Sequence, residues 1–240
     1  MKYNIAVAAV ALACAAVSPA YAAPGLGGEV YSATVEKGET EFEARWDELD
    51  GGPDDGESVF MLEAAHGVTD KFLLALKGEF EKDPGSSREA EAMAVEAIYE
   101  LGQLGGIDFA LYGEYEIVFE GADKIETKLL LQRKSGPWDV RLNLIAEKEL
   151  EDGEPLEFEY AASADVATVG ELRLGIEAFG ELGTSKNFLP NAEHFVGPSA
   201  KFEIEGLGPE IEIQAGYLFA IGKARDDADG QFRLGLEIEF

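Results

Sequence analysis

The chain has 240 residues, of which 48 are acidic and only 19 basic, so its formal net charge at pH 7 is −29. A chain this negative repels nucleic-acid phosphates and anionic lipid head groups, which argues strongly against a nucleic-acid partner and a basic peripheral membrane contact. Hydrophobic residues still make up 46% of the chain, which is too many for an intrinsically disordered protein.

The first 22 residues have the pattern of a cleavable secretory signal peptide. Lys2 supplies the positive end, residues 5–16 form a short apolar run, and residues 20–22 (Ala-Tyr-Ala) fit the small-residue cleavage motif. A lipoprotein signal ending before Cys14 is the alternative. Cleavage after residue 22 would remove the only cysteine, so we expect no disulfide and no thiolate metal site in a mature chain that begins at Ala23.

From residue 40 onward, alternating apolar and polar segments of about ten residues are separated by turns rich in Gly, Pro and Asp, a pattern typical of transmembrane strands. The predicted strands cover 40–49, 57–68, 71–82, 90–101, 107–120, 125–134, 138–150, 155–169, 171–182, 195–205, 211–221 and 231–240. Short and long connections largely alternate, which favours an up-and-down barrel over a lipocalin-like or sandwich fold. We therefore predict an all-β fold, an antiparallel up-and-down transmembrane β-barrel of about 12 strands over residues 40–240. Residues 23–39 are expected to form a short periplasmic N-terminal segment.

Alternation also assigns the two faces of each strand. In residues 107–120, Phe109 and Leu111 would face lipid while Glu114 and Glu116 point inward, because a charge near the bilayer centre costs several kcal/mol. The predicted lumen and selectivity residues are Glu41, Glu43, Asp108, Glu114, Glu116, Glu157, Glu159, Glu212, Glu237 and Glu239. The predicted inward basic residues, which could brace neighbouring strands as ion pairs, are Arg45, Lys77, Lys128, Arg141, Arg173, Lys201 and Arg233.

The last predicted strand alternates without a break and ends on the final residue of the sequence. Its apolar positions are Phe232, Leu234, Leu236, Ile238 and Phe240. This pattern resembles the closing strand of Gram-negative outer-membrane β-barrels, in which a terminal Phe with alternate apolar residues is the assembly signal. The resemblance implies that Phe240, Ile238 and Leu236 are read by the barrel-assembly machinery. It also implies a place in the cell outer membrane, surrounded by its lipid.

Two short stretches resemble a narrower group. Residues 67–70 (Gly-Val-Thr-Asp) and 194–198 (His-Phe-Val-Gly-Pro) look like features of usually uncharacterised proteobacterial barrels. Some of those barrels are grouped with proteins encoded near aromatic-degradation or metal-resistance functions. The resemblance covers two turns, the closing strand and the overall layout, and it implies no substrate and no catalytic residue.

The sequence offers little for catalysis. Its two histidines, His66 and His194, fall at opposite ends of the predicted barrel, so they could not act together. A rim triad of His194 with Ser185 or Ser199 is the enzymatic alternative, of the kind that outer-membrane lipid hydrolases use. Phosphate-binding loops and metal-ligand motifs are absent from the sequence. We therefore predict that the protein is not an enzyme and has no cofactor and no metal site.

The function predicted from these features is a passive, cation-preferring pore or small-solute channel with a strongly acidic lumen and small cations or solutes as partners. The alternative is a closed structural or surface-interaction barrel whose acidic loops, such as the one holding Asp226, Asp227 and Asp229, bind divalent cations. A soluble periplasmic protein is a third possibility.

Overall fold

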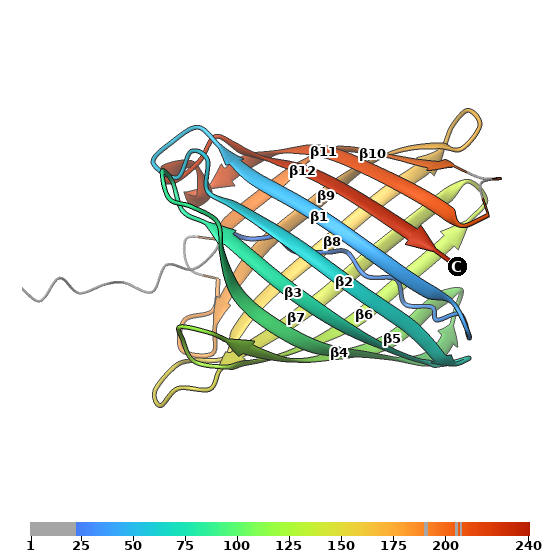
Figure 1. Cartoon of the computed structure of the whole chain (residues 1–240), viewed down its shortest axis with the longest axis horizontal. Coiled ribbons are helices and arrows are strands. Elements are labelled where there is room, and N and C mark those ends of the chain that lie inside the picture. Colours follow the sequence, from blue (N-terminus) through green and yellow to red (C-terminus); the bar gives the residue numbers. More distant parts are fainter. Residues whose placement is uncertain (1–22, 190–191, 205, 207) are drawn as a thin grey trace, which may run out of the picture.

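In a computed structural model that describes residues 23–189, 192–204, 206 and 208–240, the chain forms a closed barrel of antiparallel strands (Figure 1). The strands are β1 (Thr40–Asp50), β2 (Ser58–Thr69), β3 (Phe72–Lys82), β4 (Glu89–Leu104), β5 (Ile107–Val118), β6 (Lys124–Ser135), β7 (Trp138–Glu149), β8 (Glu157–Ala167), β9 (Leu172–Thr184), β10 (Glu193–Ile204), β11 (Glu210–Gly222) and β12 (Gly230–Glu239). The predicted fold class is confirmed, and the predicted strand ends differ from the observed ones by at most three residues. The predicted signal peptide and Cys14 lie outside the described residues.

One short 3-10 helix, η1 (Lys223–Asp226), interrupts the connection between β11 and β12. The described residues contain no helix that is both long and apolar enough to cross a membrane.

The ring closes where β12 pairs with β1, from Glu41 opposite Glu239 to Asp50 opposite Gly230. The last rung is double: the Thr40 amide donates to the Phe240 carbonyl at 3.2 Å, and the Phe240 amide donates to the Thr40 carbonyl at 3.0 Å. The Phe240 ring also meets Phe42 edge-on, with the ring centroids 6.2 Å apart. Closure leaves no strand edge unpaired, which removes the sites at which sheets add further strands.

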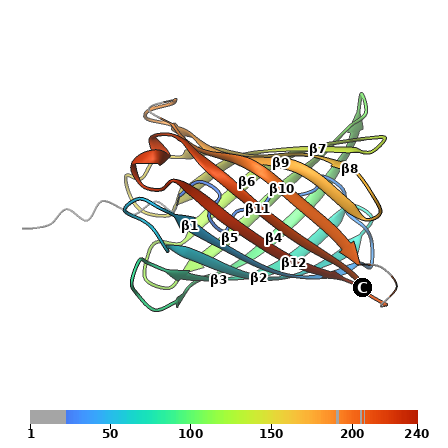
Figure 2. The same ribbon diagram turned by 90° about the horizontal axis from the view of Figure 1, so that it is seen from above.

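The two ends of the barrel differ. The end that carries Thr40 and Phe240, called the inner end here, has tight turns such as the one between β4 and β5. There Gly105 and Gly106 have φ of +64° and +80°, the left-handed values that a two-residue hairpin turn requires. The opposite, outer end carries longer loops, including the one that contains η1 (Figure 2).

The face assignment is confirmed on β5. Leu111 is 49% exposed on the outer surface, whereas its neighbours Ala110 and Tyr112 are 0% and 2% exposed because they point into the barrel. Glu114 and Glu116 share their inward face, and Tyr115 and Ile117 share the outward face of Leu111. The barrel therefore has an apolar outer surface and an interior that holds the charged side chains.

The N-terminal segment, residues 23–39, lies inside the barrel rather than beyond its inner end. Figures 1 and 2 show it entering at the outer end and running through the lumen to the start of β1. Leu26 packs into an apolar cluster with Leu49 and Phe179, and Tyr31 is buried in a second cluster with Tyr112. Inward apolar side chains of the wall thus bury Leu26 and Tyr31 of the segment.

The two faces of the wall should tolerate a new charge differently. Leu111→Arg places a guanidinium against lipid and should destabilise the barrel by about 2–4 kcal/mol, measured by denaturant unfolding in lipid vesicles. Glu159→Arg points inward, where Glu147 and Glu181 line the same cavity, so it should cost much less. Equal losses for the two variants would contradict the face assignment.

Removing Phe240 should weaken closure, because the double rung with Thr40 and the contact with Phe42 are both lost. We expect less folded protein in the membrane fraction and less of the heat-modifiable, fast-migrating form on gels. Phe240→Tyr, which keeps the backbone rung and an aromatic ring, is the matched control. Folding of the deletion variant at the level of the unchanged chain would refute this role.

Candidate functional site

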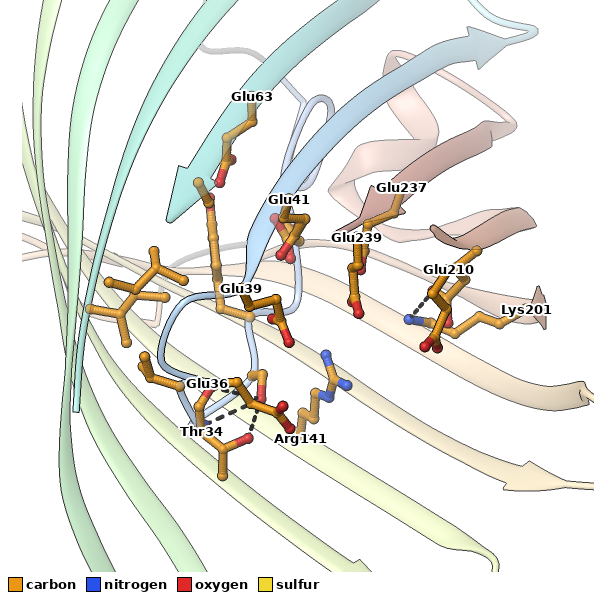
Figure 3. Close-up of a pocket in the computed structure, with 18 of the residues that line it drawn as sticks. Thr34, Glu36, Glu39, Glu41, Glu63, Arg141, Lys201, Glu210, Glu237 and Glu239 are labelled. Carbon is orange, nitrogen blue, oxygen red and sulfur yellow. Dashed lines mark hydrogen bonds and ion pairs between the residues drawn. The ribbon is translucent and has the colours of Figure 1, made fainter. Parts of the chain in front are cut away.

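The interior is the candidate functional site, and the N-terminal segment divides it into separate cavities. The inner cavity has a volume of about 410 Å³ and the outer one about 190 Å³. Glutamate is the most frequent residue in the lining of both. In Figure 3 the side chains of Glu39, Glu41, Glu237 and Glu239 gather on one side of the inner cavity, across from Arg141. The outer cavity is lined by Glu79, Glu81, Glu116, Glu147, Glu149, Glu157, Glu159 and Glu181, with Lys77, Lys124 and Lys128.

Most of the carboxylates predicted to face the lumen line these cavities. Glu41, Glu212, Glu237 and Glu239 line the inner cavity, and Glu114, Glu116, Glu157 and Glu159 line the outer one. Glu43 lines a smaller space between them with Arg45 and Arg233. Asp108 lines none of these cavities. Its carboxylate instead accepts a hydrogen bond of 2.8 Å from Gln103 Nε2 near the inner-end turn.

Strand register brings carboxylates directly opposite one another at the inner end. One row across β11, β12 and β1 is Glu210, Glu239 and Glu41, and the next is Glu212, Glu237 and Glu43. Like charges directly opposite each other on a sheet are destabilising. In the second row Glu212 is paired with Lys201 at 2.8 Å and Glu43 with Arg45 at 2.6 Å. Within the described part of the chain, no salt bridge reaches Glu41, Glu237 or Glu239.

The inner mouth carries a further carboxylate on the segment that leads into β1. Burial, together with the negative charges of Glu239 and Glu36, raises the pKa of Glu39 to about 7. Carboxylate oxygens of Glu39, Glu41 and Glu239 lie within 4.8 Å of one another. Such a cluster binds protons or attracts cations, because either one relieves the repulsion.

Lys77 is the central cation on the β3–β5 side of the barrel. Its ammonium lies 2.7 Å from Glu114 and 3.2 Å from Glu96, whose side chains are 5% and 2% exposed. Tyr112 donates a further hydrogen bond to Glu114. These contacts confirm the predicted inward position of Lys77 and show that it braces three neighbouring strands.

A second group holds Tyr31 of the N-terminal segment. The Lys128 ammonium lies 4.3 Å from the centroid of the Tyr31 ring and 4.4 Å from that of Tyr112, within the range of a cation–π contact. The Tyr31 hydroxyl donates to Glu96 at 3.2 Å. This side chain is therefore fixed by an apolar cluster and by a buried polar partner together.

Two arginines of the wall hold the glycine-rich start of the segment. Arg45 donates to the carbonyl of Gly27 at 2.8 Å and forms a salt bridge with Glu29 at 2.8 Å. Arg233 donates to the carbonyls of Gly25 and Gly28. At Gly25, where φ is +81°, an added Cβ would lie 2.3 Å from the Phe179 ring, so only glycine fits this close approach.

Neutral amides bind the rest of the segment. Asn143 accepts from the Tyr31 amide at 2.7 Å and donates to its carbonyl at 3.1 Å. Gln132 accepts from the Ala33 amide at 3.1 Å, and Asp139 orients the Gln132 side chain by accepting from its Nε2. Sequence reasoning missed these residues. The one hint in the sequence is that Asn143 and Gln132 are uncharged amides at inward strand positions, where this chain often has charged residues.

The two histidines lie far from any catalytic arrangement. His66 Nδ1 bonds the Thr40 hydroxyl at 2.9 Å at the inner end, and His194 Nδ1 lies 3.2 Å from the Tyr160 hydroxyl. Ser185 Oγ accepts from the Leu156 amide instead. Over the described ranges, no hydrogen bond joins a serine to either histidine, so the structure gives no support to the rim triad.

Comparison with known proteins identifies the fold. Among solved structures, the chain is similar to the KdgM porin, with 12% identity, a TM-score of 0.59, and coverage of 83% of this chain and 99% of that one. It is also similar to an outer membrane channel from Pseudomonas putida, with 11% identity, a TM-score of 0.61, and coverage of 88% and 97%. No protein-family model matches the chain, and no curated protein matches it. The architecture is therefore one that outer-membrane barrels use.

Removing the central cation should destabilise the wall. Lys77→Met leaves Glu96 and Glu114 buried without their shared ammonium, a change that typically costs about 3–5 kcal/mol. Lys71→Met, in the exposed turn before β3, is the control and should change unfolding little. Adding Glu96→Gln to Lys77→Met should recover part of the loss. If Lys77→Met unfolds at the same denaturant concentration as the unchanged chain, Lys77 does not brace these strands.

Proposed function

We propose that this protein is an outer-membrane barrel that works as a narrow, passive, cation-preferring channel with an acidic lumen. The observation that carries the proposal is the pair of facing carboxylate rows across β11, β12 and β1. Three members of these rows, Glu41, Glu237 and Glu239, have no salt-bridge partner among the described residues. Mobile cations from the solvent would then supply the missing positive charge.

The carboxylate lining should make the lumen selective for cations. A narrow lumen inside a low-dielectric wall focuses the field of its fixed charges, which concentrates cations and excludes anions. Screening shortens the reach of that field to about 10 Å at 0.1 M salt, so the preference should weaken as salt increases. The N-terminal segment increases the effect, because it occupies the middle of the lumen and leaves small cavities on either side.

Support for the membrane location comes from the apolar outer surface, which includes Leu111, Ile117, Leu234 and Leu236. The fold shared with the KdgM porin is consistent with a channel. That porin has also been solved in complex with disordered oligogalacturonate, an acidic sugar chain. The carboxylate lining here would repel such a solute, so we propose small cations or cationic solutes as the transported class.

Assembly is proposed to follow the usual route for such barrels. The signal peptide would direct export, and the barrel-assembly machinery would bind the last strand through Phe240, Ile238 and Leu236. Leu236 and Ile238 alternate along β12, and Phe240 follows its last residue; Phe240 and Leu236 are exposed on the outer surface.

A closed structural barrel is the second candidate. The observation that favours it is the N-terminal segment itself, which fills much of the interior. In this alternative the acidic outer loops would bind divalent cations. However, the loop that holds Asp226, Asp227 and Asp229 turns inward, because Ala224 and Ala228 are buried beside Leu26. Asp226 and Asp229 themselves remain exposed to solvent, and Asp227 is half-buried.

Reversal potentials in planar bilayers under a KCl gradient test the channel. At pH 8, above the pKa of about 7 that Glu39 has in this cluster, we expect cation preference for the unchanged protein. Neutralising one facing pair, Glu41→Gln with Glu239→Gln, should move the reversal potential toward zero. Asp152→Asn, in the exposed loop after β7, is the matched control and should leave it unchanged. Anion preference would contradict the acidic lumen, and the absence of any conductance would favour the closed barrel.

A further inference from the structure

We propose that residues 23–35 form a displaceable internal plug, which leaves the lumen while the barrel stays intact and so switches the channel between a narrow and a wide state. This inference rests on the proposed channel function. It assigns a regulatory role to a segment that the wall binds but that takes no part in the wall itself.

The plug contributes no strand to the closed ring. Each strand of the barrel already has two strand neighbours, so the sheet needs no further strand. In the described part of the chain, backbone hydrogen bonds between the segment and the wall begin only at Gly38, whose amide donates to the Gly67 carbonyl at 2.7 Å. Side chains of the wall hold everything before that point. Departure of the plug would therefore break no rung of the sheet.

The charged wall groups that hold the plug keep partners without it, whereas Asn143 would lose its two hydrogen bonds to Tyr31. Arg45 retains Glu43 at 2.6 Å, and Arg233 retains Asp47 at 3.3 Å. Gln132 retains its two contacts with Asp139. An arginine left buried and unpaired would make departure very costly, because a buried charge needs a partner. Here the main charged contacts exist in both states, as a two-state element requires.

Repulsion within the lumen favours departure. The plug brings Glu29 to a position where its carboxylate lies within 4.8 Å of those of Glu43 and Glu63. Arg45 offsets part of this repulsion through its salt bridges with Glu29 and Glu43. Once the plug leaves, Arg45 forms a salt bridge with Glu43 alone. The plugged state thus holds one more carboxylate around the same cation.

Apolar and aromatic anchors oppose departure. Leu26 is 8% exposed and packs with Ala224 and Ala228 of the outer loop that contains η1. Tyr31 is 6% exposed, and its ring centroid lies 4.8 Å from that of Tyr112. The contact of Leu26 connects the plug to a loop at the outer end. A conformational change in that loop would therefore strengthen or weaken the binding of the plug in the lumen.

The wall holds the chain just beyond the plug. The Gly38 amide donates to the Gly67 carbonyl at 2.7 Å, and the Gly67 amide donates to the Glu39 carbonyl at 3.0 Å. Gly67 also lies so close to the segment that an added Cβ would be 1.8 Å from the Glu36 carbonyl oxygen. The segment is therefore fixed at residues 36–39, and the plug would turn at residue 35, just before this anchor. Residues 23–35 would leave the lumen together while residues 36–39 stay bound to the wall.

A reversible crosslink tests the plug directly in the full-length chain. The Ser32 hydroxyl donates to Gln132 Oε1 at 2.8 Å, so the double variant Ser32→Cys with Gln132→Cys places one thiol on the plug and one on the wall position that faces it. Single-channel conductance is measured in planar bilayers before and after a reductant. The two single-cysteine variants are the matched controls, and a thiol count before reduction confirms the disulfide.

We expect the oxidised double variant to stay in a low-conductance state and the reductant to raise its conductance several-fold, with no change in either single variant. Deleting residues 24–35 should give the high-conductance state permanently. Equal conductance of the oxidised and reduced forms would overturn the plug and leave the channel in place. No conductance in any variant, including the deletion, would overturn the channel and the plug with it.

Discussion

Closure of the sheet by the pairing of β1 with β12 is the constraint on which the rest of the structure depends. Once the ring is closed, every second side chain of every strand must point into a limited interior. In this chain the inward positions carry many carboxylates, and the register places some of them directly opposite each other, such as Glu41 and Glu239. The interior must then be filled, hydrated and neutralised without help from the apolar outer surface.

The chain meets these needs in two ways. Lysines and arginines such as Lys77 and Arg233 each contact carboxylates from neighbouring strands, so that a few cations brace much of the wall. The N-terminal segment supplies apolar side chains and backbone groups to the middle of the lumen, where Leu26 and Tyr31 are buried. The remaining negative charge lies around the cavities at the two ends of the lumen. This excess of carboxylates over basic groups would give the proposed channel its preference for cations.

The fold could be predicted almost entirely from the sequence, because period-two alternation specifies both strand existence and face. Alternation places Leu111 and Glu114 on opposite faces, and in the structure they are 49% and 8% exposed. The N-terminal segment could not be placed in the same way. It has no periodicity, and its binding depends on residues far along the chain, such as Asn143 and Gln132, which only the closed barrel brings together. Asp108 shows a further limit: its inward register is correct, but a local contact with Gln103 holds its carboxylate near a turn.

Hydrogen exchange of the barrel in lipid nanodiscs tests most directly whether residues 23–35 occupy the lumen. In the structure the amides of Tyr31 and Ala33 are hydrogen-bonded to Asn143 and Gln132 in the buried interior. We expect peptides that cover these amides to exchange far more slowly than the exposed outer loop at residues 83–88. Exchange of both regions at the same fast rate would show that the lumen is empty of the segment and would contradict the account.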